Sequence, residues 1–190
     1  MPQESQIILA SASPRRLELL AQIGITNVKV VPAEIDETPH KNESPQSYVA
    51  RMAKEKLMHV KKDYPEMKIL AADTVVAVGA RILGKAENED DALKFLNILS
   101  GRRHKVLTSV IICGGNGKIF QRVVQSVVAF KRLSKAEITD YINCGEWFGK
   151  AGGYAIQGRA AAFVKFISGS YSGVVGLPLY EVDMLIKYTD

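Results

Sequence analysis

Hydrophobic and polar residues follow two kinds of pattern along the chain, one with the period of a strand and one with that of a helix. Mostly apolar runs bounded by turn-forming residues predict strands. These runs lie at 7–10, 69–78, 82–83, 105–113, 119–130, 163–167 and 171–175. The turn at 114–117 contains three glycines, which predicts a hairpin between the two runs that flank it.

Apolar positions spaced three or four residues apart, each series preceded by a capping residue, predict helices. The expected helices cover 14–23, 45–62, 89–99, 135–143 and 179–188, and a Gly-rich loop covers 145–158. Strands that alternate with helices, together with a hairpin, indicate an α/β fold with a mixed sheet. A chain of 190 residues can bury a full core, so we expect one domain over residues 1–190.

The composition is that of an ordinary folded protein, with 47% hydrophobic and 24% charged residues. It excludes disordered and disulfide-scaffold classes, and the apolar runs are too short to span a membrane. Residues 1–5 lack the features of a signal peptide, and the spacing of Cys113 and Cys144 suggests no pairing, so we expect free thiols in the cytoplasm. The net charge of +5 indicates an anionic partner without identifying it.

Two positive side chains lie where local electrostatics disfavours them. Arg15 and Arg16 fall in the first turn of the first expected helix, where the positive end of the helix dipole repels cations. A bound phosphate would remove this repulsion, because helix N–H groups, the hydroxyls of Ser11 and Ser13 and two guanidiniums make an anion site. The alternative is a pair of solvated arginines on a surface helix.

Asp73 is a second anomaly, because it interrupts an otherwise non-ionisable run in an expected covered strand. An unpaired carboxylate there would be costly, so we expect it at a cleft beside a metal ion or basic groups. Thr74 points to the opposite face of a regular strand, so both residues can serve one site only near the strand's end. The alternative is a structural carboxylate that accepts backbone N–H bonds.

Other charged residues suit the same chemistry. Lys56 falls on the apolar side of its helix, although a lysine stem can lie along such a face without a function. Glu34 and Glu37 lie in a loop and offer oxygen ligands for a hard cation, unless they are ordinary solvated residues. The segment 79–86 is one residue short of a phosphate-binding P-loop and lacks its Ser/Thr, so we reject that motif, while Lys85 keeps the reach to bind a phosphate.

Short motifs follow one another along nearly the whole chain. They read LASASPRR (9–16), EIDE (34–37), AKEK (53–56), ADT (72–74), GK (84–85), LSG (99–101) followed by His104, KAG (150–152), YAIQG (154–158) and VGLP (175–178). In this order they resemble the Maf family. The resemblance implies a nucleoside triphosphate pyrophosphatase, which cleaves between the α- and β-phosphates with a divalent cation, Mg²⁺ or Mn²⁺.

The resemblance also implies an inosine-triphosphatase-like α/β fold, in which an elongated mixed β-sheet is flanked by helices and two lobes surround a central cleft. The family pattern matches the proton acceptor to Asp73 and the other expected catalytic residues to Lys56 and Glu37. Expected substrate-binding residues are Ser11, Arg15, Arg16, Thr74, Lys85 and Gln157. Expected metal ligands are Glu34, Glu37 and Asp73.

The YAIQG motif is similar to the branch of the family that acts on dTTP and UTP, and the family is linked to nucleotide-pool cleaning and cell-division arrest. Two alternatives stay open: the same reaction on a modified pyrimidine triphosphate or a methylated purine triphosphate such as 7-methyl-GTP, and a nucleic-acid or regulatory binding protein without activity. No basic run with interleaved aromatics supports the second. We therefore expect a nucleoside triphosphate as partner, neither nucleic acid nor membrane, and leave a homodimer open.

Overall fold

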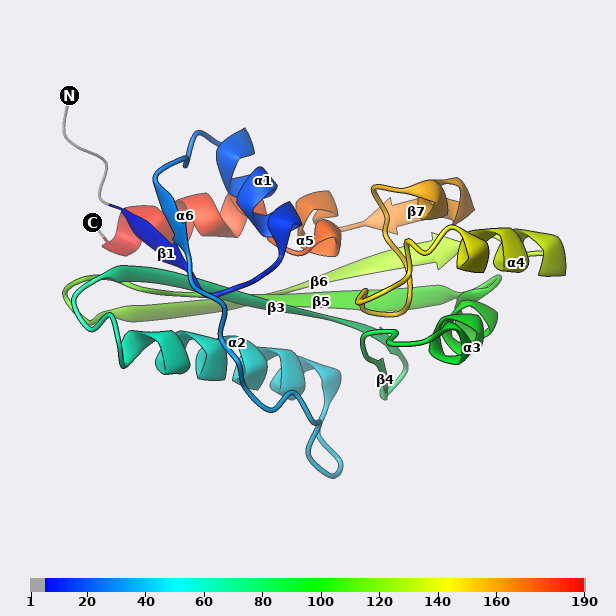
Figure 1. Ribbon diagram of the computed structural model, residues 1–190, viewed down its shortest axis with the longest axis horizontal. Coiled ribbons are helices and arrows are strands. Elements are labelled where there is room, and N and C mark those ends of the chain that lie inside the picture. The colour runs from blue at the N-terminus through cyan, green and yellow to red at the C-terminus, as the bar shows by residue number, and fades with distance from the viewer. Residues whose placement is uncertain (1–5, 190) are drawn as a thin grey trace.

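A computed structural model describes residues 6–189 of the chain (Figure 1). The prediction that residues 1–5 form no signal peptide lies outside this range. One mixed sheet contains seven of the described strands, in the order β2-β1-β3-β5-β6-β7, and β4 pairs with β3. The strands are β1 (Ile7–Leu9), β2 (Val28–Val30), β3 (Lys68–Val78), β4 (Arg81–Leu83), β5 (Arg103–Cys113), β6 (Ile119–Phe130) and β7 (Val164–Ser168).

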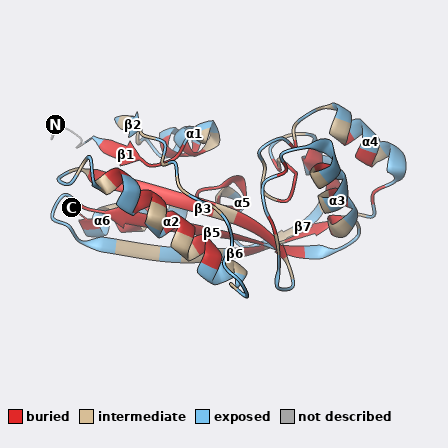
Figure 2. Ribbon diagram, turned by 60° about the horizontal axis from the view of Figure 1, so that its bottom comes forward, coloured by how far each residue is buried: buried red, intermediate tan, exposed pale blue. Residues whose placement is uncertain are grey.

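Helices cover both faces of this sheet. They are α1 (Pro14–Gln22), α2 (Pro45–Lys61), α3 (Glu89–Leu99), α4 (Lys135–Asn143), the 3₁₀ helix η1 (Arg159–Phe163), α5 (Tyr171–Val175) and α6 (Leu179–Thr189). One face carries α2, and the opposite face carries α1, α5 and α6 (Figure 1). In the turned view, α3 and α4 gather toward one end of the molecule and α1, α2 and α6 toward the other (Figure 2). The expected mixed α/β sheet with two lobes is confirmed.

Three helices begin at the predicted caps. Ser44 accepts a hydrogen bond from the backbone N–H of Ser47, and Asn88 accepts one from that of Asp91. Ser134 forms a full capping box with the residue three positions on. Each bond satisfies a backbone donor that the first turn leaves without a partner, which is worth about 1 kcal/mol. These short-range interactions explain why the starts of α2, α3 and α4 could be predicted.

The segment 171–175, predicted as a strand, is the short helix α5 instead. Gly169 follows β7 with a φ of 113°, which turns the chain away from the sheet edge. Ser170 then accepts a hydrogen bond from the N–H of Gly173 and caps the helix. The apolar residues Val174 and Val175 are buried in this helical conformation. The valines favoured a strand, but the local turn and cap decided the outcome.

The two faces of β3 contact different parts of the core. Odd-numbered residues face α2 in two separate apolar clusters, one with Ile69 and Ala71 and the other with Val75 and Ala77. Asp73 is the odd-numbered residue between these clusters. Even-numbered residues such as Leu70, Ala72 and Val76 belong to the large cluster that α1, α3, α4, α5 and α6 share. The carboxylate therefore lies at a break in the apolar layer beneath α2.

One edge of β3 is open around Asp73. On the closed edge, β5 pairs with β3 continuously from Ile69 to Ala77. On the other edge, β1 pairs only with 68–70 and β4 only with 76–78. Side chains from both faces can reach the gap at 71–75. The expectation that Asp73 and Thr74 could share a site only near the end of the strand is therefore wrong, because the opening lies mid-strand.

None of the helices within 6–189 is long and apolar enough to cross a membrane.

Candidate active site

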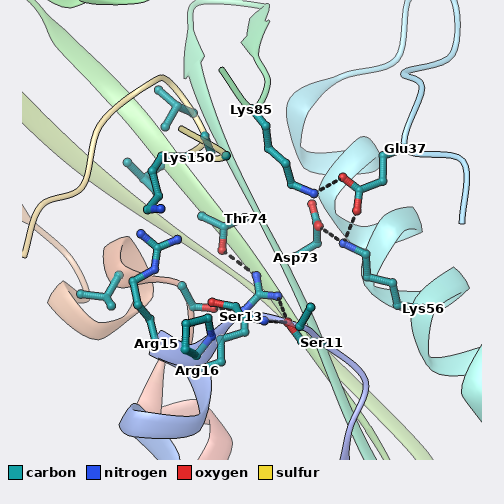
Figure 3. Close-up of a pocket in the computed structure, with 18 of the residues that line it drawn as sticks. Ser11, Ser13, Arg15, Arg16, Glu37, Lys56, Asp73, Thr74, Lys85 and Lys150 are labelled. Carbon is teal, nitrogen blue, oxygen red and sulfur yellow. Dashed lines mark hydrogen bonds and ion pairs between the residues drawn. The ribbon is translucent and has the colours of Figure 1, made fainter. Parts of the chain in front are cut away.

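A cavity of about 550 Å³ lies over the open edge of β3, between the N-terminal end of α1 and the Gly-rich loop at 145–158. It is lined by residues from distant parts of the chain, which the sheet brings together (Figure 3). All of the predicted site residues line it: Ser11, Arg15, Arg16, Glu34, Glu37, Lys56, Asp73, Thr74, Lys85 and Gln157.

Four charged side chains form a row along one side of the cavity. The Lys56 ammonium lies 2.6 Å from Oδ1 of Asp73 and 2.8 Å from Oε1 of Glu37. The second oxygen of Glu37, Oε2, lies 2.5 Å from the ammonium of Lys85. Negative and positive charges therefore alternate along the row, from Asp73 on β3 to Lys56 on α2. They continue through Glu37 in the loop before α2 to Lys85 after β4 (Figure 3).

Burial makes the charges at the inner end of this row depend on their partners. Only 8% of the side-chain surface is exposed for Lys56 and for Asp73, so neither charge is well solvated. Removing either partner would leave the other charged or force it to change protonation state. Burial by itself would raise the pKa of Glu37, but its hydrogen bonds and charge attraction with Lys56 and Lys85 hold that pKa below its usual value. Glu37 is therefore a carboxylate at neutral pH.

Arg16 forms a second polar centre, on the face of β3 opposite to Lys56. Its guanidinium donates to the carbonyl of Gly176 (2.8 Å), to Oγ of Ser11 (2.8 Å) and to Oγ1 of Thr74 (3.3 Å). Burial lowers the pKa of this guanidinium, which the nearby charge of Asp73 partly offsets. An arginine keeps its proton under these conditions, so Arg16 is a fixed positive charge on the cavity wall.

A chain of hydroxyl groups continues from Arg16 into the sheet. Thr108 of β5 donates to the carbonyl of Gly173 at 2.7 Å, and its Oγ1 lies 2.9 Å from Oγ1 of Thr74. A hydroxyl carries one hydrogen. Since Thr108 donates its hydrogen to Gly173, Thr74 must donate its own hydrogen to Thr108. Thr74 consequently accepts from Arg16 and has no hydrogen left for the cavity.

The loop before α1 presents small polar groups to the same space. Ser11 accepts from the backbone N–H of Ser13 at 3.3 Å, in addition to the bond from Arg16. Ser13 precedes α1 but makes no side-chain capping bond, in contrast to the caps of the three helices described above. Arg15 projects from the first turn of α1, and burial lowers the pKa of its guanidinium. Hydroxyls, a helix N-terminus and two guanidiniums therefore converge here, as an anion site requires.

A family model described as Maf-like protein matches residues 6–189. The chain belongs to the Maf family. A curated relative from Zymomonas mobilis, named dTTP/UTP pyrophosphatase, is 57% identical over 182 residues, which are 96% of this chain and 90% of the relative. A relative of the same name from Caulobacter vibrioides is 55% identical and covers 95% of this chain and 94% of its own. Among solved structures, a HAM1 protein from Coxiella burnetii covers 69% of this chain and 75% of its own, at 16% identity and a TM-score of 0.44.

The carboxylates of this Maf protein suit a divalent cation that arrives with a nucleotide. Within 6–189, no three His, Cys, Asp or Glu side chains are grouped closely enough to hold a metal ion by themselves. This differs from the expected ligand set of Glu34, Glu37 and Asp73, because Lys56 bridges two of the three carboxylates. Magnesium usually keeps several waters and takes one or two carboxylates together with substrate phosphates. Asp73 and Glu37 fit that incomplete set.

Several residues around the cavity of the Maf protein were missed from the sequence. Lys150 and the exposed Phe148 line it from the Gly-rich loop, and Tyr154 lines it from deeper in the same loop. Tyr154 lies 2.8 Å from Nε2 of the buried His104, so its ring is held in place. Lys150 and Tyr154 lie in segments noted as motifs and Phe148 in the predicted Gly-rich loop, but their side chains carried no local anomaly. Only the folded loop shows that they face the site.

Proposed function

We propose that this Maf protein hydrolyses dTTP and UTP between the α- and β-phosphates, and releases the nucleoside monophosphate and pyrophosphate. One observation carries the proposal. The buried pair of Asp73 and Lys56 lies on the wall of a cavity that is otherwise rich in cations and hydroxyls. The names of the relatives from Zymomonas mobilis and Caulobacter vibrioides support the choice of dTTP and UTP.

The charge of the cavity matches a polyphosphate chain. A nucleoside triphosphate carries about four negative charges, which phosphoryl-transfer sites balance with arginine, lysine, backbone donors and a divalent cation. Arg15, Arg16 and Lys85 supply positive charge on different sides of the cavity. Three of the five N–H groups of Arg16 are used within the protein, so two are left for phosphate oxygens. Positioning and electrostatic stabilisation are therefore the main contributions of these residues.

Asp73 is placed to act on the attacking water. Its Oδ1 is held by Lys56, whereas its Oδ2 makes no hydrogen bond to another described residue and can accept a proton. The Lys56 ammonium fixes the orientation of the carboxylate. Glu37 holds Lys56 from the other side, so the orientation of the base depends on both neighbours. A positioned general base contributes about 10²- to 10⁴-fold to a rate.

We propose Mg²⁺ or Mn²⁺ as the cofactor, held by Asp73 and Glu37 together with the phosphates. Glu34, the third expected ligand, lines the same cavity. When bound, such a cation neutralises charge on the phosphates and polarises the reacting oxygen. The residues of the chain then have to orient the substrate and accept the proton.

Gln157 is the proposed contact to the base. Its exposed side chain lines the cavity from the Gly-rich loop. The amide offers two donors and one acceptor, which complement the N3–H and carbonyl groups of thymine and uracil. A base that lacks N3–H, such as cytosine, cannot complete this pattern.

The test is a substrate screen that measures released pyrophosphate. Purified protein with Mg²⁺ or Mn²⁺ is expected to hydrolyse dTTP and UTP about 5- to 150-fold faster, in kcat/KM, than CTP or 7-methyl-GTP, because one unpaired polar group costs about 1–3 kcal/mol. Preference for 7-methyl-GTP would overturn the choice of base. Release of no pyrophosphate from any triphosphate would overturn the reaction.

A further inference from the structure

Two positive side chains face one another across the cavity. Arg15 projects from α1 and Lys150 from the Gly-rich loop, and Figure 3 shows their charged ends turned toward each other. Both line the cavity, and both are partly buried. The two groups come from opposite sides of the cleft, so the fold brings together charges that repel.

No described carboxylate pairs with either group. Neither Arg15 nor Lys150 takes part in a salt bridge within 6–189, and the Lys150 ammonium donates only to the carbonyl of Phe148, at 3.1 Å. Burial lowers the pKa of Lys150, and the charge of Arg15 lowers that pKa further. Glu146 offsets only part of this repulsion. Glu18 and Glu146 attract Arg15 and Lys150, respectively, without forming a salt bridge. Two desolvated cations that make no salt bridge indicate a place for an anion.

The loop that carries Lys150 is held firmly in place. The N–H of Ala86 donates to the carbonyl of Lys150 at 3.1 Å, and the N–H of Gly149 donates to the carbonyl of Ala86 at 2.9 Å. These bonds attach the loop to the segment that contains Lys85. Gly152 has a φ of 66°, and a Cβ atom there would lie 2.9 Å from side-chain atoms of Val76. The loop therefore packs closely against β3, and the position of Lys150 is fixed by the fold.

We propose that Lys150 is a substrate-binding residue that forms a clamp with Arg15 around one phosphate group of the nucleotide. The clamp joins the two lobes, because Arg15 lies on α1 in one lobe and Lys150 lies in the Gly-rich loop of the other. It rests on the proposed function for the identity of the substrate, and it adds a binding residue from the Gly-rich loop. A phosphate between the two cations would replace their repulsion with two charge-assisted hydrogen bonds.

Binding of inorganic tripolyphosphate, measured by calorimetry without metal, tests the clamp independently of catalysis. Lys150→Gln is expected to weaken binding at least about tenfold, which is the loss of one charge-assisted hydrogen bond. Lys150→Arg, which keeps the charge, is expected to stay within about threefold of the wild type. Lys135→Gln is the matched control, because Lys135 is an exposed lysine on α4 outside the cavity. This control removes the same net charge without touching the site.

Equal affinity of Lys150→Gln and the control would overturn the proposal, and so would a wild type that does not bind tripolyphosphate. A thermal unfolding midpoint of Lys150→Gln near that of the wild type establishes that the variant is folded. The KM for dTTP gives a second readout, which should rise at least about tenfold while the Lys135→Gln value stays constant. Tripolyphosphate binding that depends on Lys150, combined with no hydrolysis of any triphosphate, would support the clamp and overturn the proposed function instead.

Discussion

The ammonium of Lys56 lies 2.6 Å from the carboxylate of Asp73, between two apolar clusters beneath α2. Such a pair gains little stability over well-packed apolar residues, because both charges lose their hydration. Its presence in the middle of the central strand therefore points to a use beyond stability. Removing one partner has a different effect on stability from removing both. This difference allows the contribution of the pair to stability to be separated from its contribution to activity.

Asp73→Asn should remove activity and keep substrate binding. The amide has nearly the same shape and still accepts from Lys56 through its oxygen, but it is no longer a base. We expect kcat for dTTP to fall about 10²- to 10⁴-fold, with the affinity for tripolyphosphate unchanged or higher. Pyrophosphate release and calorimetry measure the two quantities. Activity within tenfold of the wild type would contradict the assignment of the base.

Lys56→Met should be strongly destabilising on its own, because it leaves the buried Asp73 without its cation. We expect a loss of about 3–5 kcal/mol in the free energy of unfolding, measured by urea denaturation. Combining it with Asp73→Asn should recover a large part of this loss, since no buried charge then lacks a partner. Equal losses in the single and double variants would show that the unpaired charge of Asp73 is not the cause of the destabilisation.

Gly152→Ala should cost more than Gly149→Ala, although both glycines have φ values near 65°. Positive φ costs an alanine about 1–2 kcal/mol at either position. At Gly149 nothing lies within 4 Å of the added Cβ, whereas at Gly152 the Cβ meets Val76 at 2.9 Å. We expect a further loss of about 1–3 kcal/mol from this overlap, and weaker tripolyphosphate binding because the Lys150 loop is displaced. Similar unfolding midpoints for the two variants would contradict the close packing.

Stability should fall as His104 becomes protonated in the unfolded chain. Burial between Phe130 and Tyr154 lowers the pKa of His104 to about 4, and its Nδ1 has no hydrogen-bond partner among the described residues. The unfolded state, with the ordinary pKa of about 6.5, therefore binds the proton first as the pH falls. Between pH 7.5 and 5.5 this effect should cost ~1.3 kcal/mol.

Urea denaturation of the wild type and of His104→Gln at both pH values measures this contribution. The variant lacks the titrating group, so the pH dependence of its stability should be smaller by that amount. The interval stays above the range in which Asp and Glu side chains take up protons. An equal slope in both proteins would show that His104 is not the responsible group.

Much of the fold could be predicted because its elements begin with local signals. Ser44, Asn88 and Ser134 cap their helices through bonds to residues three positions away, and such bonds are visible in a short window of sequence. The segment 171–175 was misassigned because its valines suggested a strand, while the turn at Gly169 and the cap at Ser170 had more influence on the conformation. The local sequence predicts an element correctly only where its apolar pattern, its turn residues and its cap are considered together.

The candidate site was predictable to the extent that residues violated local rules. Asp73 in an apolar run and Arg15 at a positive helix end were visible as anomalies in the sequence. The open edge of β3 was not, because it depends on where β1 stops pairing and β4 begins, some distance away along the chain. Thr108 and Lys150 were missed for the same reason, since an ordinary residue becomes part of a site only through long-range contacts.

The hydroxyl chain that runs from Arg16 through Thr74 and Thr108 to the carbonyl of Gly173 has a fixed direction of hydrogen donation. On the cavity side, Thr74 can offer only a lone pair. A phosphate oxygen placed against it meets another acceptor, whereas an N–H group of a base is complemented. If the nucleotide binds as proposed, Thr74 at the centre of the sheet therefore favours an orientation in which the base, rather than a phosphate, lies against it.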